Sequence, residues 1–370
     1  MLPTLSATMG IALILLALWD GFRTVVLPRR VTGRFRLNWV FYRIVWPQWA
    51  RLVACTTARR RDRLLGVYSP LALLVQIAIW AGALIVGFAL LQWSLGPNLE
   101  DPIGPADFGS TLYFSGVTFL TLGFGDVTPL TPLSRFLAVV ESGIGFGFLA
   151  VVIGYLPMFY SAFAQREVTV TVLDARAGSP PSAVEFLRRC LQVSQTEELL
   201  ASWEYWAAEL LESHMSYPAL GLFRSQHDHQ SWLAALTTML DTCALILVGL
   251  EGVSAHRARL TFAMARHVAV DLTQVYDINP AAHGPDRLAP QTLEQVRIVL
   301  AQAGLPMRKG PQAAARLAEL RSMYEPYVAA LSRFLVMPLP PWLPIEDRQD
   351  AWEASPYDDV HWTMIDERRE

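Results

Sequence analysis

The stretch that decides the fold is Thr121-Leu122-Gly123-Phe124-Gly125-Asp126, which lies between two long apolar segments. A dehydrated cation needs a stack of oxygen ligands, and a strand supplies them only when its carbonyl groups all point the same way. That arrangement requires left-handed or otherwise unusual backbone angles at alternate residues, which glycine adopts readily. Gly123 and Gly125 have this spacing. The stretch therefore predicts a cation selectivity filter.

The other residues of this stretch add oxygen at both of its ends. Thr121 contributes a hydroxyl at the inner end. Asp126 contributes a carboxylate at the outer end, where we expect it to brace the filter from behind or to enrich cations. We expect Gly125 to let the chain turn out to the mouth. The predicted ion ligands are the Thr121 hydroxyl and the carbonyl oxygens of Thr121, Leu122, Gly123 and Phe124.

The sequence here resembles the pore family of potassium channels, whose signature is Thr-x-Gly-(Tyr or Phe)-Gly-Asp. The resemblance covers about residues 70–160 and implies that K⁺ is the permeant ion. Residues 107–120 resemble the pore helix, with Asp107 as its N-cap, and Pro129 follows the filter as it often does in the family. Arg135 and Gly145 lie where many two-helix channels carry an arginine and a hinge glycine.

The chain departs from the family pattern at two positions. Many members have a second threonine where this chain has Leu120, and valine or isoleucine is commoner where it has Leu122. These departures bear on selectivity for K⁺ over Na⁺. A weakly selective channel for monovalent cations is therefore an alternative to a K⁺-selective one.

Composition divides the chain into a membrane part and a soluble part. Of the 370 residues, 53% are hydrophobic, and most of the long apolar runs fall within residues 1–164. This part has 12 basic and 7 acidic residues, whereas the remainder has 18 basic and 26 acidic residues. A membrane domain followed by a soluble domain is the simplest explanation.

Three segments are long and apolar enough to cross a bilayer: residues 71–93, 133–160 and, with Asp20 and Arg23 in it, 9–27. We expect Asp20 and Arg23 to pair on one helix face. A signal peptide is the alternative for the first segment, although a basic start and a clear cleavage site are missing.

Arginine placement predicts the orientation in the cell membrane. Residues 21–66 contain eleven arginines and one acid, whereas residues 94–132 contain four acids and no basic residue. Short basic loops stay in the cytoplasm. We therefore expect the N-terminus and an acidic, cation-attracting mouth outside, and the C-terminal half in the cytoplasm.

Residues 37–55 are rich in tryptophan and arginine and are interrupted by Pro47. We interpret them as a helix at the inner membrane interface, with tryptophans in the head-group layer and nearby arginines close to anionic membrane lipid. The alternative is a cytosolic helix that packs against the pore.

One filter strand cannot enclose an ion, whereas four strands around an axis can, so the chemistry predicts a homotetramer. In the second pore span, Gly145 and Pro157 are the predicted gating hinge. For Gly145, close helix packing is an equal alternative, and it is the favoured interpretation of Gly143, Gly147 and Gly154. No apolar span in the sequence carries an arginine at every third position, so we do not expect voltage gating.

Glu141 is an ionisable residue at membrane depth, where such groups usually pair or line water. We hypothesise that Glu141 bonds to the pore helix of its own or the next subunit and supports the filter.

The half after residue 165 has mainly helical periodicity. Residues 167–174 alternate valine and threonine and predict a short strand. We expect residues 234–250 to form a buried core helix, with a membrane segment as the alternative, and the prolines at 338–344 to end the folded part. The predicted helices span about 180–193, 195–214, 229–250, 256–277, 291–304 and 311–336.

No motif in this half predicts a cofactor. It contains no GxGxxG fingerprint, so we expect no organic cofactor. His227, Asp228 and His229, with His214 upstream, fit no strong metal-ligand spacing, and a polar loop is the ordinary interpretation. We also expect neither nucleic-acid binding nor enzymatic activity.

Together these features predict an all-α membrane protein: a tetrameric potassium-channel pore with an extra N-terminal transmembrane helix and an all-α cytosolic domain that controls opening. An alternative from another class is a membrane sensor or scaffold with a silent pore. The predicted domains are an N-terminal transmembrane helix with a basic interfacial segment (1–66), the pore domain (67–163), a helical cytosolic domain (164–338) and an acidic tail (339–370).

Overall fold

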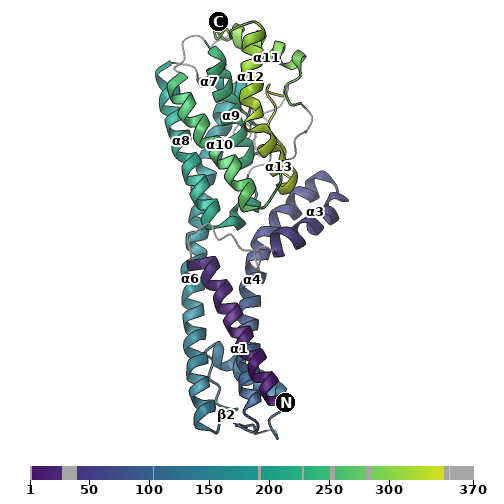
Figure 1. Cartoon of the computed structure of the whole chain (residues 1–370), viewed down its shortest axis with the longest axis vertical. Coiled ribbons are helices and arrows are strands. Elements are labelled where there is room, and N and C mark those ends of the chain that lie inside the picture. Colours follow the sequence, from purple (N-terminus) through teal and green to yellow (C-terminus); the bar gives the residue numbers. More distant parts are fainter. Residues whose placement is uncertain are drawn as a thin grey trace, which may run out of the picture. The chain divides into compact units, whose positions relative to one another are not determined.

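A computed structural model describes most of the chain, and it divides into two compact units, Met1–Ser161 and Ala162–Glu370. The described elements are almost all helices, with one pair of two-residue strands, so the predicted all-α class is confirmed (Figure 1). The described residues are 2–26, 40–102, 104–190, 193–226, 229–250, 255–280, 286–345 and 350.

Long apolar helices build the first unit. Three of them are long and apolar enough to cross a membrane, over Pro3–Val25, Arg60–Ser94 and Pro132–Ala177, which agrees with the three predicted spans. The elements are α1 (Leu2–Gly21), η1 (Phe22–Val26), η2 (Phe41–Val45), α3 (Trp46–Ala54), α4 (Ala58–Ser94), β1 (Leu99–Glu100), α5 (Phe108–Phe119), β2 (Thr128–Pro129) and α6 (Pro132–Ala177).

Helix α1 packs antiparallel along α4. A Cβ on Gly10 would lie 2.6 Å from the Gly87 carbonyl oxygen, so glycine at this position allows the two backbones to touch. Ser6 Oγ donates to the carbonyl of Leu90 at 2.8 Å near one end of the contact. Near the other end, Asp20 accepts a 2.8 Å hydrogen bond from Trp80 Nε1, which provides a polar partner for this carboxylate inside an apolar helix pair.

Helix α3 and the start of α4 form a packed hairpin. Pro47 occupies the first turn of α3, directly after η2 ends at Val45, so the predicted segment changes from π-helix to α-helix beside this proline. Trp46 is buried against Tyr68, with ring centroids 4.9 Å apart, and the Tyr68 hydroxyl donates to the Phe41 carbonyl at 2.8 Å. Residues 37–39 of the predicted interfacial helix lie outside the described residues.

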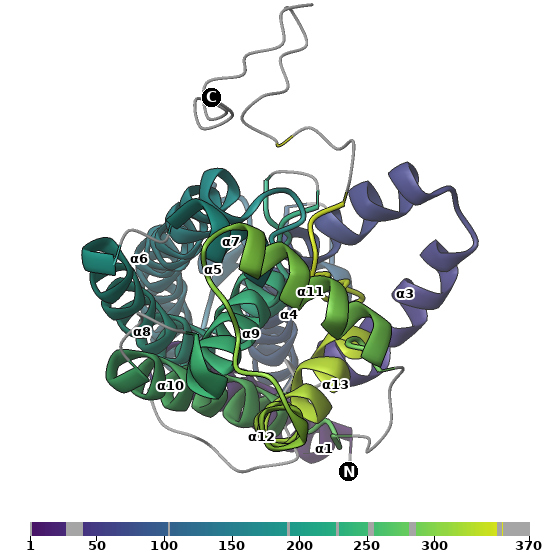
Figure 2. The same ribbon diagram turned by 90° about the horizontal axis from the view of Figure 1, so that it is seen from above.

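The second unit surrounds a buried central helix, α9. Figure 2 shows α9 among its neighbours, and it contacts α7, α10, α12 and α13. Almost every residue of α9 is buried within this unit, which confirms the predicted core helix. The elements are the end of α6, α7 (Ala183–Cys190), α8 (Val193–Ser216), η3 (Pro218–Leu222), α9 (Trp232–Gly249), α10 (Ala255–Val275), α11 (Pro290–Gln302), α12 (Pro311–Ser322) and α13 (Glu325–Leu335).

The predicted strand at residues 167–174 is wrong. These residues continue α6 without a break as far as Ala177. Burial follows helical spacing, because Arg166, Val170, Leu173 and Ala177 are all buried. Alternating valine and threonine favour a strand locally, but this packing outweighs their weak intrinsic preference.

The predicted helix at residues 311–336 is also wrong in one respect, because it is two helices. Helix α12 ends at Ser322 and α13 begins at Glu325. Pro326 lies in the first turn of α13, and a proline inside one continuous helix would remove a backbone hydrogen bond. The buried Tyr324, with φ of −131°, forms the break between them.

A buried ion pair holds this part of the second unit together. Arg287 Nη2 lies 2.6 Å from the fully buried Asp241 carboxylate on α9, which also accepts a 2.5 Å bond from the Tyr324 hydroxyl. Burial disfavours the charged form of Arg287, but Asp241 outweighs it and raises the pKa of the guanidinium above its usual value. Arg287 therefore stays protonated.

The proline-rich segment packs into the fold and does not end it. The Pro340 carbonyl accepts a 2.8 Å bond from Arg287, and Trp342 is buried beneath the guanidinium groups of Arg287 and Arg321. Asp350, within the predicted acidic tail, pairs with Arg189 at 2.7 Å. The ordered contacts of the second unit thus extend past residue 338.

Candidate functional site

The pore helix is α5, and its first turn is capped as predicted. The Asp107 carboxylate accepts a 2.8 Å hydrogen bond from the Ser110 backbone N–H, which satisfies a donor that the helix leaves unpaired. At the other end, the backbone N–H groups of Thr121 and Leu122 donate to the carbonyls of Thr118 and Val117. The filter stretch therefore starts directly from the carboxyl end of the helix, which carries partial negative charge.

Backbone angles in the filter alternate in handedness. Gly123 has φ of 60° and Gly125 has φ of 77°, so the predicted left-handed angles are confirmed. Thr121 also has a positive φ, of 57°. A β-branched residue rarely adopts this conformation, and the sequence analysis did not predict it for Thr121. Left-handed angles at every second residue are what a row of carbonyls needs in order to face one side.

The filter packs little against the rest of its own chain. All residues from Thr121 to Asp126 are exposed in the single chain, including 53% of Leu122 and 66% of Phe124. A Cβ added to either filter glycine would meet no atom within 4 Å. Both the carbonyl side and the apolar side chains of this strand are therefore available for further contacts.

A tyrosine on the pore helix holds the outer end of the filter. The Tyr113 hydroxyl donates a 2.7 Å hydrogen bond to Asp126 Oδ2. This bond holds the pKa of Asp126 below its usual value, so the carboxylate is ionised at neutral pH. Bracing by Asp126 was expected, but its partner was missed, because Tyr113 lies 13 residues earlier and carries no sequence signal for this contact.

Glu141 on α6 lies at a contact among α4, α5 and α6. Its side chain is fully buried, and its Oε1 accepts a hydrogen bond from Ser115 Oγ on the pore helix. The same Ser115 hydroxyl lies 2.7 Å from the Ile85 carbonyl on α4. The expected bond from Glu141 to the pore helix of its own subunit is therefore present. The second carboxylate oxygen of Glu141 has no hydrogen-bond partner within the described part of the chain.

Gly145 on α6 lies directly against the backbone of the pore helix. A Cβ at this position would lie 1.9 Å from the Phe119 carbonyl oxygen, so only glycine fits without a shift of the backbone. A Cβ on Gly143, Gly147 or Gly154 would meet nothing within 4 Å. Close packing thus explains Gly145 but not these other glycines within one chain. Pro157 lies inside α6, and its role in a hinge stays a prediction.

A buried polar cluster connects the C-terminal end of α4 to the N-terminal end of α6. Asn98 Nδ2 donates to Gln92 Oε1 at 2.8 Å, and the Ser134 hydroxyl donates to the same oxygen at 2.8 Å. Gln92 Nε2 in turn donates to the Ser134 carbonyl at 3.1 Å. The hydrogen-bonding groups of these buried side chains pair with one another. Such a network holds the two helix ends in a fixed arrangement.

Residues 73–162 match the family model described as an ion channel. This segment is an ion-channel domain. The match contains α5, the filter stretch and α6 as far as residue 162, and it confirms the resemblance predicted from the filter stretch.

Several proteins are similar to parts of the chain. Two-pore potassium channel 5 of Arabidopsis thaliana is 50% identical over 65 residues, which is 18% of this chain and 16% of the plant protein. Protein LctB of Geobacillus stearothermophilus is 32% identical over 84 residues, or 20% of this chain and 62% of LctB. The uncharacterized membrane protein YdjJ of Bacillus subtilis is 22% identical over 190 residues, or 51% of this chain and 56% of YdjJ.

The chain therefore spans less than two thirds of the length of each of these relatives. No solved structure matches the chain significantly.

His214, one of the polar residues that the sequence singled out in the second unit, has a structural role. His214 is fully buried, its Nδ1 lies 2.8 Å from the Leu210 carbonyl, and burial lowers its pKa to about 3. His227 and Asp228 lie outside the described residues, and the described ones contain no group of three metal-ligating side chains.

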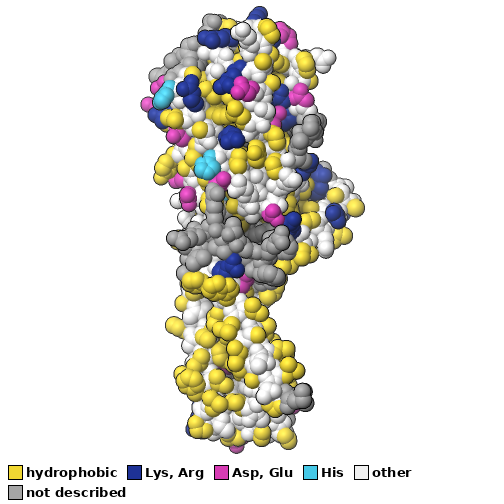
Figure 3. All heavy atoms as spheres, in the orientation of Figure 1, with side chains coloured by type: hydrophobic (Ala, Val, Ile, Leu, Met, Phe, Trp, Pro, Cys, Tyr) yellow, Lys and Arg dark blue, Asp and Glu magenta, His cyan; other side chains and the backbone are white. Residues whose placement is uncertain are grey.

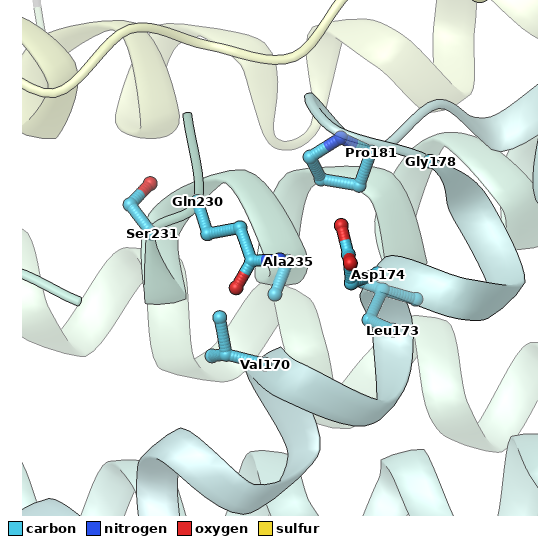
Figure 4. A pocket seen from close by; sticks show the side chains of 8 residues that line it. All are labelled: Val170, Leu173, Asp174, Gly178, Pro181, Gln230, Ser231 and Ala235. Carbon is cyan, nitrogen blue, oxygen red and sulfur yellow. The ribbon is translucent and has the colours of Figure 1, made fainter. Parts of the chain in front are cut away.

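A small pocket lies between the end of α6 and the start of α9 (Figure 4). Ser231 in its lining is the N-cap of α9, because its Oγ accepts a 3.0 Å hydrogen bond from the Ala234 backbone N–H. The lining residues are Val170, Leu173, Asp174, Gly178, Pro181, Gln230, Ser231 and Ala235.

Proposed function

We propose that the chain is one subunit of a homotetrameric, K⁺-selective channel that conducts K⁺ passively. The observation that carries this proposal is the alternation of left-handed angles at Thr121, Gly123 and Gly125 inside an ion-channel domain. The names of two plant relatives, both two-pore potassium channels, support K⁺ as the permeant ion.

Backbone carbonyls replace the water around the ion in this proposal. The ligands are the carbonyl oxygens of Thr121, Leu122, Gly123 and Phe124, with the Thr121 hydroxyl at the inner end. The exposed filter strand supports a tetramer, because one strand supplies only one side of a coordination shell. Each pore helix points its carboxyl end toward the central cavity, where four partial negative charges stabilise a cation.

The second unit controls opening in this proposal. Helix α6 runs from the filter region into that unit as one continuous helix, which gives a covalent route for coupling. The arginine-rich segment at 21–66 and the acidic segment at 94–132 support a cytoplasmic location for the second unit and an external filter mouth. The same arginine-rich segment is the proposed contact with anionic membrane lipid.

Flux through reconstituted protein tests the proposal. The purified chain is placed in lipid vesicles, and currents are measured across K⁺ and Na⁺ gradients. We expect reversal potentials close to the K⁺ equilibrium value. Gly123→Ala should abolish flux, because alanine is strained at φ of 60°. Gly82→Ala is the matched control, since Gly82 is helical and has open space around it.

The rival functions predict other currents. A weakly selective cation channel is favoured by Leu122, where the family more often has valine or isoleucine, and it would give reversal potentials between the K⁺ and Na⁺ values. A sensor or scaffold with a silent pore would give no current with intact wild-type protein. Either result would refute K⁺-selective conduction.

A further inference from the structure

The part of α6 that belongs to the second unit has two unlike faces. One face is anchored in that unit, with Arg166, Val170 and Leu173 each 3% exposed. Arg166 donates to the carbonyls of Leu220 at 2.7 Å and Phe223 at 3.0 Å, beside η3. This face is already buried by contacts inside the chain. Only the opposite face of the helix is therefore available to contact another molecule.

The opposite face is exposed, uncharged and regularly spaced. It carries a stripe, here called the heptad stripe, that consists of Ser161, Ala164, Val168, Thr171 and Ala175. All five residues are exposed, and they alternate at spacings of three and four. This 3.5-residue period is the pattern by which parallel helices pack along a common seam.

Apolar exposure marks the same face. Val168 is 63% exposed, and its neighbour Val172, one turn further on, is 43% exposed. Three charged residues of this segment, Arg166, Glu167 and Asp174, are buried, and the fourth, Arg176, is half-buried and lies outside the stripe. A row of exposed valines without charge is costly for a helix in water and suits a contact between identical surfaces, where like charges would repel.

The spacing also continues upstream in the sequence. Gly147, Ala150, Gly154 and Pro157 extend the alternation of three and four back into the pore span, and all are exposed in the single chain. Neither Gly147 nor Gly154 has a neighbouring atom within 4 Å of an added Cβ. Small residues let helix backbones approach closely inside a membrane.

We propose that the heptad stripe is a contact between copies of this chain, in which four α6 helices run parallel and pack around one axis beyond the membrane span. The inference rests on the proposed homotetramer. A rotation axis through the pore makes the four α6 helices parallel and brings the same residues to the axis. Rings of Val168, with Ala164 and Thr171 above and below, then exclude water at the seam.

Disulfide trapping in the full-length chain tests this contact. The exposed Cys55 is first changed to serine, while Cys190 and Cys243 are buried and stay. Val168→Cys is then added, the protein is reconstituted in vesicles and oxidised, and the products are separated without reductant. We expect most chains to shift to a covalent dimer that a thiol reverses. The control is Tyr205→Cys on α8, which is 68% exposed but lies outside the stripe.

K⁺ flux in the same vesicles separates the two proposals. If flux is K⁺-selective but Val168→Cys gives no more dimer than Tyr205→Cys, the heptad stripe is not a subunit contact, although the channel function stands. If Val168→Cys gives the covalent dimer but the vesicles show no K⁺ flux, the heptad stripe is a subunit contact and the proposed channel function is refuted. A second variant, Val168→Asp with Thr171→Cys, should lose the dimer that Thr171→Cys alone gives, because four carboxylates would meet at the axis.

Discussion

At the scale of single residues, the filter is held by side chains that lie far from it in sequence. Tyr113 and Glu141 illustrate this, since one bonds to Asp126 and the other to Ser115 of the pore helix. Neither contact carries an ion ligand. Both restrain the pore helix and filter, so their loss should alter how the filter behaves before it alters the fold.

Tyr113→Phe removes the hydroxyl that binds Asp126 and should shift the response to external acid. The hydrogen bond keeps the pKa of Asp126 below its usual value, so the ionised form is lost only as pH falls through that lowered pKa. Without the bond, protonation should begin at a higher pH. Currents recorded across external pH should therefore fall at higher pH in the variant than in wild type.

The control for Tyr113→Phe is Tyr205→Phe, an exposed tyrosine outside the pore region. It should leave the pH profile unchanged. Equal profiles for wild type and Tyr113→Phe would show that the bond does not support the filter.

Glu141→Gln keeps the size of the side chain and its acceptor for Ser115 but removes its ionisable group. We expect altered gating or inactivation, measured as the time course of current after a step in voltage or K⁺ concentration. Ser115→Ala is the partner variant, because it removes the donor and should weaken the contact by about 1 kcal/mol. Currents of Glu141→Gln that match wild type at every pH would rule out a role in filter support.

At the scale of elements, local signals predicted the pore better than the second unit. Asp107 capped its helix and the filter glycines took left-handed angles, because these features depend on neighbouring residues only. The strand predicted at 167–174 failed because its valines and threonines continue a helix whose other face is buried. The Tyr113 and Ser115 contacts depend on tertiary structure, which residue spacing does not reveal.

Gly145→Ala tests whether packing or bending explains this glycine. A Cβ would lie 1.9 Å from the Phe119 carbonyl oxygen, and such overpacking destabilises by roughly 1–3 kcal/mol. We expect a lower melting temperature in detergent. Gly143→Ala is the matched control, because it meets nothing within 4 Å in the chain. Unchanged melting together with altered gating would support the hinge and exclude the packing explanation.

Arg287→Ala should strongly destabilise the second unit. It leaves the fully buried Asp241 carboxylate without its ion partner, and the loss of one member of a buried pair costs about 3–5 kcal/mol. Arg316→Ala breaks an exposed pair with Glu319 and should cost less than about 1 kcal/mol. Thermal unfolding of the full chain measures both, and similar losses for the two variants would contradict the assignment.

At the scale of the whole molecule, the ion itself should stabilise the proposed tetramer. A ligand that binds only the assembled state raises its stability, by about 2.7 kcal/mol when present at roughly 100 times its dissociation constant. We expect a higher melting temperature in K⁺ than in Na⁺ at equal ionic strength. Gly123→Ala should lose the difference. Identical melting of wild type in both salts would count against carbonyl coordination of K⁺.

The surface of the molecule is consistent with two environments. Figure 3 shows hydrophobic side chains crowding the face of the first unit, whereas lysine, arginine and acidic side chains are interspersed on the second. Sequence composition alone predicted this division, because apolar runs and charge content change together near residue 165. Composition does not predict which apolar side chains meet lipid and which meet another subunit.

The touching backbones of α1 and α4 have a practical consequence. Gly10 and Gly87 let the two helix backbones touch, so we expect a tilt of α4 to move α1 as well. Leu5 is 64% exposed and lies near the Ser6 contact with Leu90. A fluorescent dye attached at Leu5 would therefore act as an optical reporter of the motion of α4, at a site that leaves the permeation machinery chemically untouched.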